Sequence, residues 1–191
     1  MHLHTFFSAY GVRSVEKETF FCVGSNSRWQ KIAHRCSYNV AVPFAIRDFK
    51  PEDFETLWQV DQQCFPPGIS YSRQELKVYL RRKGSFTLVA VGRDGATIAG
   101  FIVGYGGPTG HIITIDVIAE ARRSGVGSLL LRAAEERLQA AGAKAVGLET
   151  AVDNLAALSF YKRHGYSVVR TWPRYYSNGV DALVMKKELT G

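Results

Sequence analysis

A glycine-containing turn at residues 122–128, Arg-Arg-Ser-Gly-Val-Gly-Ser, constrains the fold of this chain more than any other segment. It follows a predicted strand at 111–118 and opens a predicted amphipathic helix at 125–141. Glycine lets the backbone come close to a ligand, and the N–H groups of a helix start attract anions. The pattern predicts a pyrophosphate-binding turn, with a flexible turn carrying solvated arginines as the alternative.

Two common nucleotide-binding turns are excluded by the residues themselves. A dinucleotide-binding fingerprint needs a third glycine where Leu130 stands. A P-loop needs a Gly-Lys-Ser or Gly-Lys-Thr sequence that this segment lacks. If the turn binds phosphate, it therefore belongs to another class of phosphate binder.

The rest of the pattern predicts one α/β (α+β) domain in the order βααβββαβαββ, with a mixed sheet and helices packed on it. Ser72 and Glu75 form a capping box for the second helix, and Asp153 or Asn154 caps the fourth. The Asp-Gly pair at 94–95 predicts a hairpin. The predicted strands are 44–49, 86–93, 97–104, 111–118, 145–150, 166–172 and 182–188, and the predicted helices are 51–64, 72–82, 125–141 and 154–164.

The first residues differ from the rest, because residues 1–41 show weak apolar periodicity. We expect residues 1–41 to be a poorly ordered N-terminal extension and 42–191 to be the catalytic domain. A targeting or tethering arm is the alternative, although Glu16 and Glu18 argue against a transit peptide. No apolar run approaches the roughly 18–20 residues that span a bilayer, so no membrane association is expected.

Cysteine usage and charge limit the class of protein further. Cys22, Cys36 and Cys64 are far apart and form no CxxC pair, which predicts reduced thiols in a cytoplasmic protein without a metal site. The 24 Lys and Arg residues against 17 Asp and Glu give a net charge of +7. This charge suits an acidic ligand or proximity to the ribosome, with a scattered basic surface as the alternative. No zinc finger or basic block interleaved with aromatics indicates direct readout of nucleic acid.

The Arg-x-x-Gly-x-Gly turn and a second motif together resemble the acetyl-CoA-dependent N-acetyltransferases of the GNAT superfamily. The second motif comprises Leu148-Glu149-Thr150, Asn154, Phe160-Tyr161 and Gly165-Tyr166. The resemblance extends from Phe44 to Leu189. It implies the GNAT fold, a mostly antiparallel seven-stranded sheet with four helices, in which the pantetheine arm enters between strands 111–118 and 145–150. The cofactor-binding residues that it implies are Ile115, Asp116, Val117, Arg122, Arg123, Ser124, Gly125, Val126, Gly127, Ser128 and Asn154.

Three residues are candidates for acid–base chemistry. Glu149 lies in an otherwise apolar strand, where a carboxylate is costly unless it faces a wet cleft, so it is the predicted general base. Its alternative is a surface residue under period-two alternation. Tyr161 matches the family's general acid, and its alternative is a core tyrosine. His111, which we expect to begin its strand, is a rival or helper base, or an ordinary surface histidine.

The acceptor is indicated by a closer resemblance to the ribosomal-protein-alanine type of protein N-terminal acetyltransferase. Tyr175 and Tyr176 match the tyrosines that grip the substrate backbone in that family, and Phe65-Pro66 match the start of its peptide-binding loop. Val180 and the residues after Pro66 depart from the family pattern, and both positions lie near the substrate. The implied acceptor is a protein N-terminus; the alternatives are a small-molecule amine or a non-catalytic acyl-CoA-sensing module.

Overall fold

The computed structural model describes residues 44–65 and 70–189, and within them seven strands and four α-helices follow the predicted order. The predicted extension, residues 1–41, lies outside the described residues. Short 3-10 helices at Pro51–Asp53 and Ala119–Ala121 precede the first helix and the glycine turn. The strands are β1 Phe44–Asp48, β2 Ser85–Gly92, β3 Ile98–Tyr105, β4 Thr109–Val117, β5 Ala145–Ala151, β6 Ser167–Trp172 and β7 Ala182–Glu188, and the helices are α1 Phe54–Cys64, α2 Arg73–Arg81, α3 Val126–Ala140 and α4 Leu155–Arg163.

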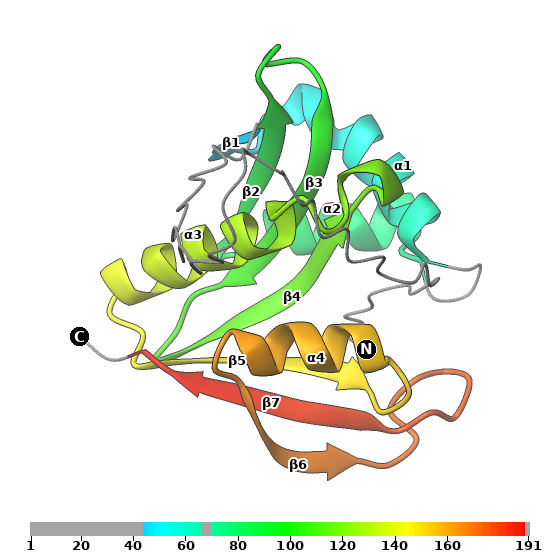
Figure 1. The fold of residues 1–191 in the computed structure, drawn as a ribbon, viewed down its shortest axis with the longest axis vertical. Helices are drawn as coiled ribbons and strands as arrows, with labels where there is room; N and C mark the ends of the chain where they lie inside the picture. The colour runs from blue at the N-terminus through cyan, green and yellow to red at the C-terminus, as the bar shows by residue number, and fades with distance from the viewer. Residues whose placement is uncertain (1–43, 66–69, 190–191) are drawn as a thin grey trace, which may run out of the picture. The chain divides into compact units, whose positions relative to one another are not determined.

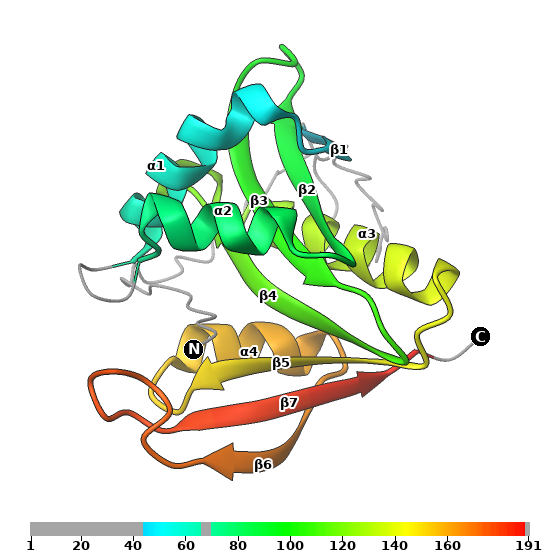
Figure 2. The same cartoon turned by 180° about the vertical axis from the view of Figure 1, so that it is seen from behind.

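The strands form one sheet in the order β1-β2-β3-β4-β5-β7-β6. Every neighbouring pair is antiparallel except β4 and β5, which are parallel. Helices α3 and α4 lie on one face of the sheet (Figure 1), and Figure 2 shows α1 and α2 on the other. The mostly antiparallel seven-stranded sheet with four helices is the arrangement that the resemblance implies.

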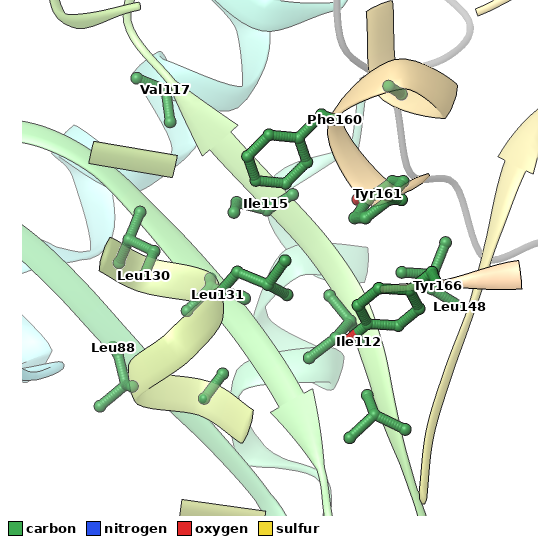
Figure 3. Close-up of a cluster of buried hydrophobic side chains, with 14 of the residues drawn as sticks. Leu88, Ile112, Ile115, Val117, Leu130, Leu131, Leu148, Phe160, Tyr161 and Tyr166 are labelled. Atoms are coloured by element: carbon green, nitrogen blue, oxygen red, sulfur yellow. The ribbon is translucent and has the colours of Figure 1, made fainter. Parts of the chain in front are cut away.

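Two apolar clusters hold these layers together, one on each face of the sheet. Figure 3 shows the cluster under α3 and α4, which includes Leu130 and Leu131 of α3 and Ile112 of β4. The second cluster joins Leu57 of α1 and Leu76 of α2 to the opposite face. Alternate residues of the central strands β2, β3 and β4 pack into one cluster or the other, so these strands are buried on both faces.

Strands β4 and β5 separate soon after they meet, which creates the setting for the site. They pair only at Thr109↔Ala145, Gly110↔Val146 and His111↔Gly147. Beyond this point the register of β4 against β3 shifts between Val103 and Gly104, where an extra β4 residue forms a bulge. A bulge bends its strand, so β4 turns away while β5 continues beside β7 (Figure 2).

Candidate active site

The glycine turn has the backbone of an anion cradle. Arg123 and Gly125 both have positive φ, at 61° and 92°, and the arginine is a residue type that seldom adopts this conformation. The first α3 hydrogen bond runs from the Leu129 N–H to the Gly125 carbonyl (3.0 Å), so the N–H groups of Val126, Gly127 and Ser128 lie outside the helical ladder. These groups point out of the positive end of a 15-residue helix, an arrangement that fits a diphosphate.

The two arginines of the turn have different positions. Arg122 donates from Nε to the Val117 carbonyl (3.1 Å), and its guanidinium lies 3.8 Å from the Cys64 sulfur. Arg122 therefore ties the turn to the end of β4 and to α1. The Arg123 side chain is exposed beside the turn. Of the two predicted phosphate ligands, Arg122 is partly buried against the protein and Arg123 is exposed to solvent.

His111 and Glu149 lie together where β4 and β5 begin to separate. The His111 Nε2 and Glu149 Oε2 atoms are 3.0 Å apart, although their angle is not that of a hydrogen bond. The side chain of Glu149 is 6% exposed and that of His111 is 23% exposed, so solvent reaches the imidazole first. Both face the α1/α2 side of the sheet, because Leu148, next to Glu149, packs under α3 and α4. The expectation that His111 begins its strand is wrong, because Thr109 and Gly110 already pair with β5.

Tyr161 approaches from the other face of the sheet. It is fully buried on α4, beside Phe160 and Tyr166 (Figure 3), and its hydroxyl has no hydrogen-bond partner among the described residues. Burial, and then the Asp116 carboxylate, raise the pKa of the Tyr161 phenol well above its ordinary value. The phenol therefore stays protonated near neutral pH and can donate a hydrogen bond.

Asn154 has a structural role in addition to its predicted one. Its Oδ1 accepts from the Ala157 N–H (3.1 Å), which caps α4. The other half of the amide, Nδ2, is buried and makes no hydrogen bond within the described part of the chain. Ile115 and Val117 are buried under α3 and α4, so a ligand would meet their backbone and not their side chains.

The predicted substrate residues differ in exposure. Tyr176 is 2% exposed and packs on Ala151 and Ala182, while Tyr175 is half-buried between Tyr176 and Trp172. Phe65 is buried in the α1/α2 cluster, so its side chain contributes to the core. Pro66 lies outside the described residues.

A buried carboxyl pair near the site was not identified from the sequence. Asp61 of α1 is fully buried and accepts from the Tyr71 N–H (2.8 Å) and the Gln62 amide (2.9 Å). Burial raises the pKa of the Asp61 carboxyl to about 7. Burial, and then Asp61, raise the pKa of Asp116 well above its ordinary value. The available signal in the sequence is a charged residue that shares the helical spacing of the apolar residues Leu57 and Cys64.

This pair should make stability depend on pH. An acid with a raised pKa binds its proton more tightly in the folded state, so the unfolding free energy should fall between about pH 4 and pH 7. Asp61→Asn removes the part of this loss that Asp61 causes, and it keeps an oxygen that accepts from the Tyr71 N–H. The unfolding free energy of the variant, measured with guanidinium at several pH values, should therefore rise relative to that of the wild type as the pH increases. The difference should grow by up to about 1.4 kcal/mol per pH unit. If the unfolding free energies of the two proteins depended on pH in the same way, the raised pKa of Asp61 would be wrong.

Other kinds of site are not evident in the described part of the chain. No helix there is long and apolar enough to cross a membrane, and no three His, Cys, Asp or Glu side chains gather as a metal site. Burial raises the pKa of the Cys64 thiol to about 12, which keeps it neutral and unsuited to act as a nucleophile. Its Sγ–H donates to the Val117 carbonyl (3.4 Å), a structural contact.

The helix start with N–H groups outside the ladder and the neighbouring pair of parallel strands that separate are the features that the resemblance to acetyl-CoA-dependent transferases implies. The chain belongs to the acetyltransferase (GNAT) family, whose pattern matches residues 53–166. It is therefore an N-acetyltransferase, of a family that uses acetyl-CoA.

Individual relatives are similar over most of the domain. N-alpha-acetyltransferase 30 of Schizosaccharomyces pombe is 34% identical over 116 residues, which cover 59% of this chain and 77% of the relative. An uncharacterized N-acetyltransferase of Methanocaldococcus jannaschii is 31% identical over 147 residues, or 75% and 90% of the two chains. Among solved structures, Ard1 from Thermoplasma volcanium superposes with a TM-score of 0.71 at 27% identity, covering 78% of this chain and 99% of that one. A chain of the NatC complex bound to Gag peptide and CoA gives 0.67 at 25% identity, covering 77% and 99%.

Proposed function

We propose that this acetyltransferase acts on the α-amine of a protein N-terminus. The observation that carries the proposal is the pairing of Glu149 with His111 on the face opposite Tyr161. An α-ammonium group has a pKa of about 8, which such a pair can deprotonate near neutral pH. A lysine, with a pKa of about 10.4, would cost about 3 kcal/mol more. The similarity to N-α-acetyltransferases supports the same acceptor.

The residues of the cradle would hold the cosubstrate. The N–H groups of Val126, Gly127 and Ser128 would bind its diphosphate, with Arg123 beside them. Acetyl-CoA supplies the acetyl group as a thioester. The backbone near Val117, where β4 has left β5, would donate to the acetyl carbonyl and stabilise the developing oxyanion.

The acid and base would act from opposite faces of the sheet. Glu149 would take a proton from the ammonium group, with His111 or a water molecule as the link to solvent. The amine nitrogen then bonds to the carbonyl carbon as the carbon–sulfur bond breaks. Tyr161 would give its proton to the departing thiolate, which is desolvated by the same burial that raises the pKa of the phenol. The phenolate would regain its proton from solvent after the products leave.

An acceptor panel tests the proposal. We expect the kcat/KM at pH 7 for a peptide with a free N-terminus to exceed that for a lysine peptide with a blocked N-terminus by about 10²-fold. The matched control is the first peptide with its α-amine blocked, which should be inert. Mass spectrometry locates the acetyl group. A preference for the lysine peptide or for polyamines would reject the N-terminal acceptor and leave the acetyltransferase assignment intact.

A further inference from the structure

A histidine that is not among the residues of either sequence motif, His164, is linked to the last residue of the cradle, Ser128. The His164 Nε2 atom lies 2.9 Å from the Ser128 hydroxyl oxygen. Its other ring nitrogen, Nδ1, lies 2.8 Å from the Phe160 carbonyl oxygen. His164 follows the last turn of α4, the helix that carries Tyr161, while Ser128 is in the first turn of α3. The pair thus connects the cradle to the helix of the predicted acid.

The partner of Nδ1 determines what Nε2 can do. A carbonyl oxygen only accepts, so Nδ1 carries a hydrogen in either charge state of the ring. In neutral His164, Nε2 is then bare and accepts the Ser128 O–H, which leaves only lone pairs on the hydroxyl for a ligand. In protonated His164, Nε2–H donates to the Ser128 oxygen, and the hydroxyl hydrogen is released for a phosphate oxygen.

We propose that His164 is a positioning residue for the diphosphate of acetyl-CoA, acting through the Ser128 hydroxyl, and that binding of this anion is accompanied by uptake of a proton on Nε2. The proposal rests on the predicted cradle and not on the identity of the acceptor amine. A negative charge at the turn favours the imidazolium, which donates through Ser128 and adds a positive charge to the helix end. The proton comes from solvent. Each protein molecule in which His164 changes from neutral to protonated therefore gains one proton on binding.

The other charged groups near the pair do not provide this switch. Arg132 donates from Nε to the Ser128 carbonyl (3.3 Å), and Lys162 and Arg163 occupy the last turn of α4. Arginine and lysine, unlike histidine, are not residue types that switch charge near neutral pH. Glu135, further along α3, is bound to Lys187 at 2.6 Å. Phe160 contributes an aromatic ring whose centroid is 4.4 Å from that of His164.

Calorimetric titration with dephospho-CoA tests the proposal without requiring catalysis. This ligand keeps the diphosphate but lacks the 3′-phosphate, whose own titration near pH 6 would add to the signal. The wild-type Kd should rise by about three- to tenfold from pH 6 to pH 8, and buffers of different ionisation enthalpy should reveal proton uptake. In His164→Gln the Kd should change by less than about twofold over this pH range, and binding should take up no proton.

Matched variants separate the possible outcomes. Ser128→Ala should also lose the pH dependence, and Ser128→Thr, which keeps the hydroxyl, should retain it. His111→Ala should retain it as well, because His111 is on the other face of the sheet. A pH dependence that survives in both His164→Gln and Ser128→Ala would overturn the proposal. Unchanged affinity in Gly125→Val would instead reject the cradle itself, because a valine at φ 92° would distort the turn.

Discussion

Glu149→Gln should lower turnover of an N-terminal peptide at pH 7 by about 10²-fold, as expected for loss of a positioned general base. Glutamine keeps the shape of the side chain but cannot accept the proton. Raising the pH past about 8 should restore part of the rate, because the α-amine then loses its proton to solvent. A pH–rate series from about pH 6 to pH 9.5 measures both effects.

The controls for this prediction use the neighbouring histidine and a second acceptor. His111→Ala should have the smaller effect if the imidazole only links Glu149 to solvent. A lysine peptide should show little recovery over the same pH range, because its pKa is about 10.4. A full rate in Glu149→Gln together with a collapsed rate in His111→Ala would make His111 the base.

Tyr161→Phe should reduce turnover by about 10²-fold or more while leaving acetyl-CoA affinity unchanged. The change removes only a hydroxyl, and that hydroxyl has no hydrogen-bond partner in the described part of the chain. Its loss should therefore not lower the melting temperature, because burying an unpaired polar group costs free energy. Steady-state kinetics, calorimetry with acetyl-CoA and thermal unfolding provide the three measurements.

Together, turnover, acetyl-CoA affinity and melting temperature distinguish a catalytic role of Tyr161 from a structural one. If Tyr161 were only a core residue, Tyr161→Phe would lower the stability of the protein or would leave turnover within a factor of two or three of the wild type. A catalytic tyrosine loses turnover alone, and the defect should be smaller with an acyl donor whose leaving thiol is more acidic. If turnover falls only in proportion to a loss of folded protein, the proton donor is another group.

The elements of the fold were predictable because their signals are local. Ser72 accepts from the Glu75 N–H (3.2 Å) as the capping box requires, and the Asp94 side chain closes the predicted hairpin through the Thr97 N–H (3.1 Å). Gly142, with φ 91°, follows the end of α3. Each depends on residues a few positions apart, so neighbouring sequence carries the necessary information.

Contacts between segments distant in the chain were harder to predict from the sequence. Arg122 is next to Arg123 in sequence, yet its guanidinium lies on the Val117 carbonyl and near Cys64, which no local pattern indicates. Phe65 has the family's position for a substrate loop but packs in the α1/α2 cluster. Asp61 shares the helical spacing of apolar residues, but this spacing does not indicate that Asp61 interacts with Asp116 of β4.

By itself, the sequence determined the order of strands and helices, the glycine turn at the start of α3, and the family whose motifs those residues match. Only the tertiary structure decided that His111 lies beside Glu149, that Tyr161 approaches from the opposite face, and that His164 reaches Ser128. Hydrogen bonding and side-chain periodicity within an element depend on nearby residues. The register of β4 against β5, the bulge that separates them and the packing of α4 beside α3 depend on segments distant in the chain. These arrangements place His111 beside Glu149 and His164 beside Ser128.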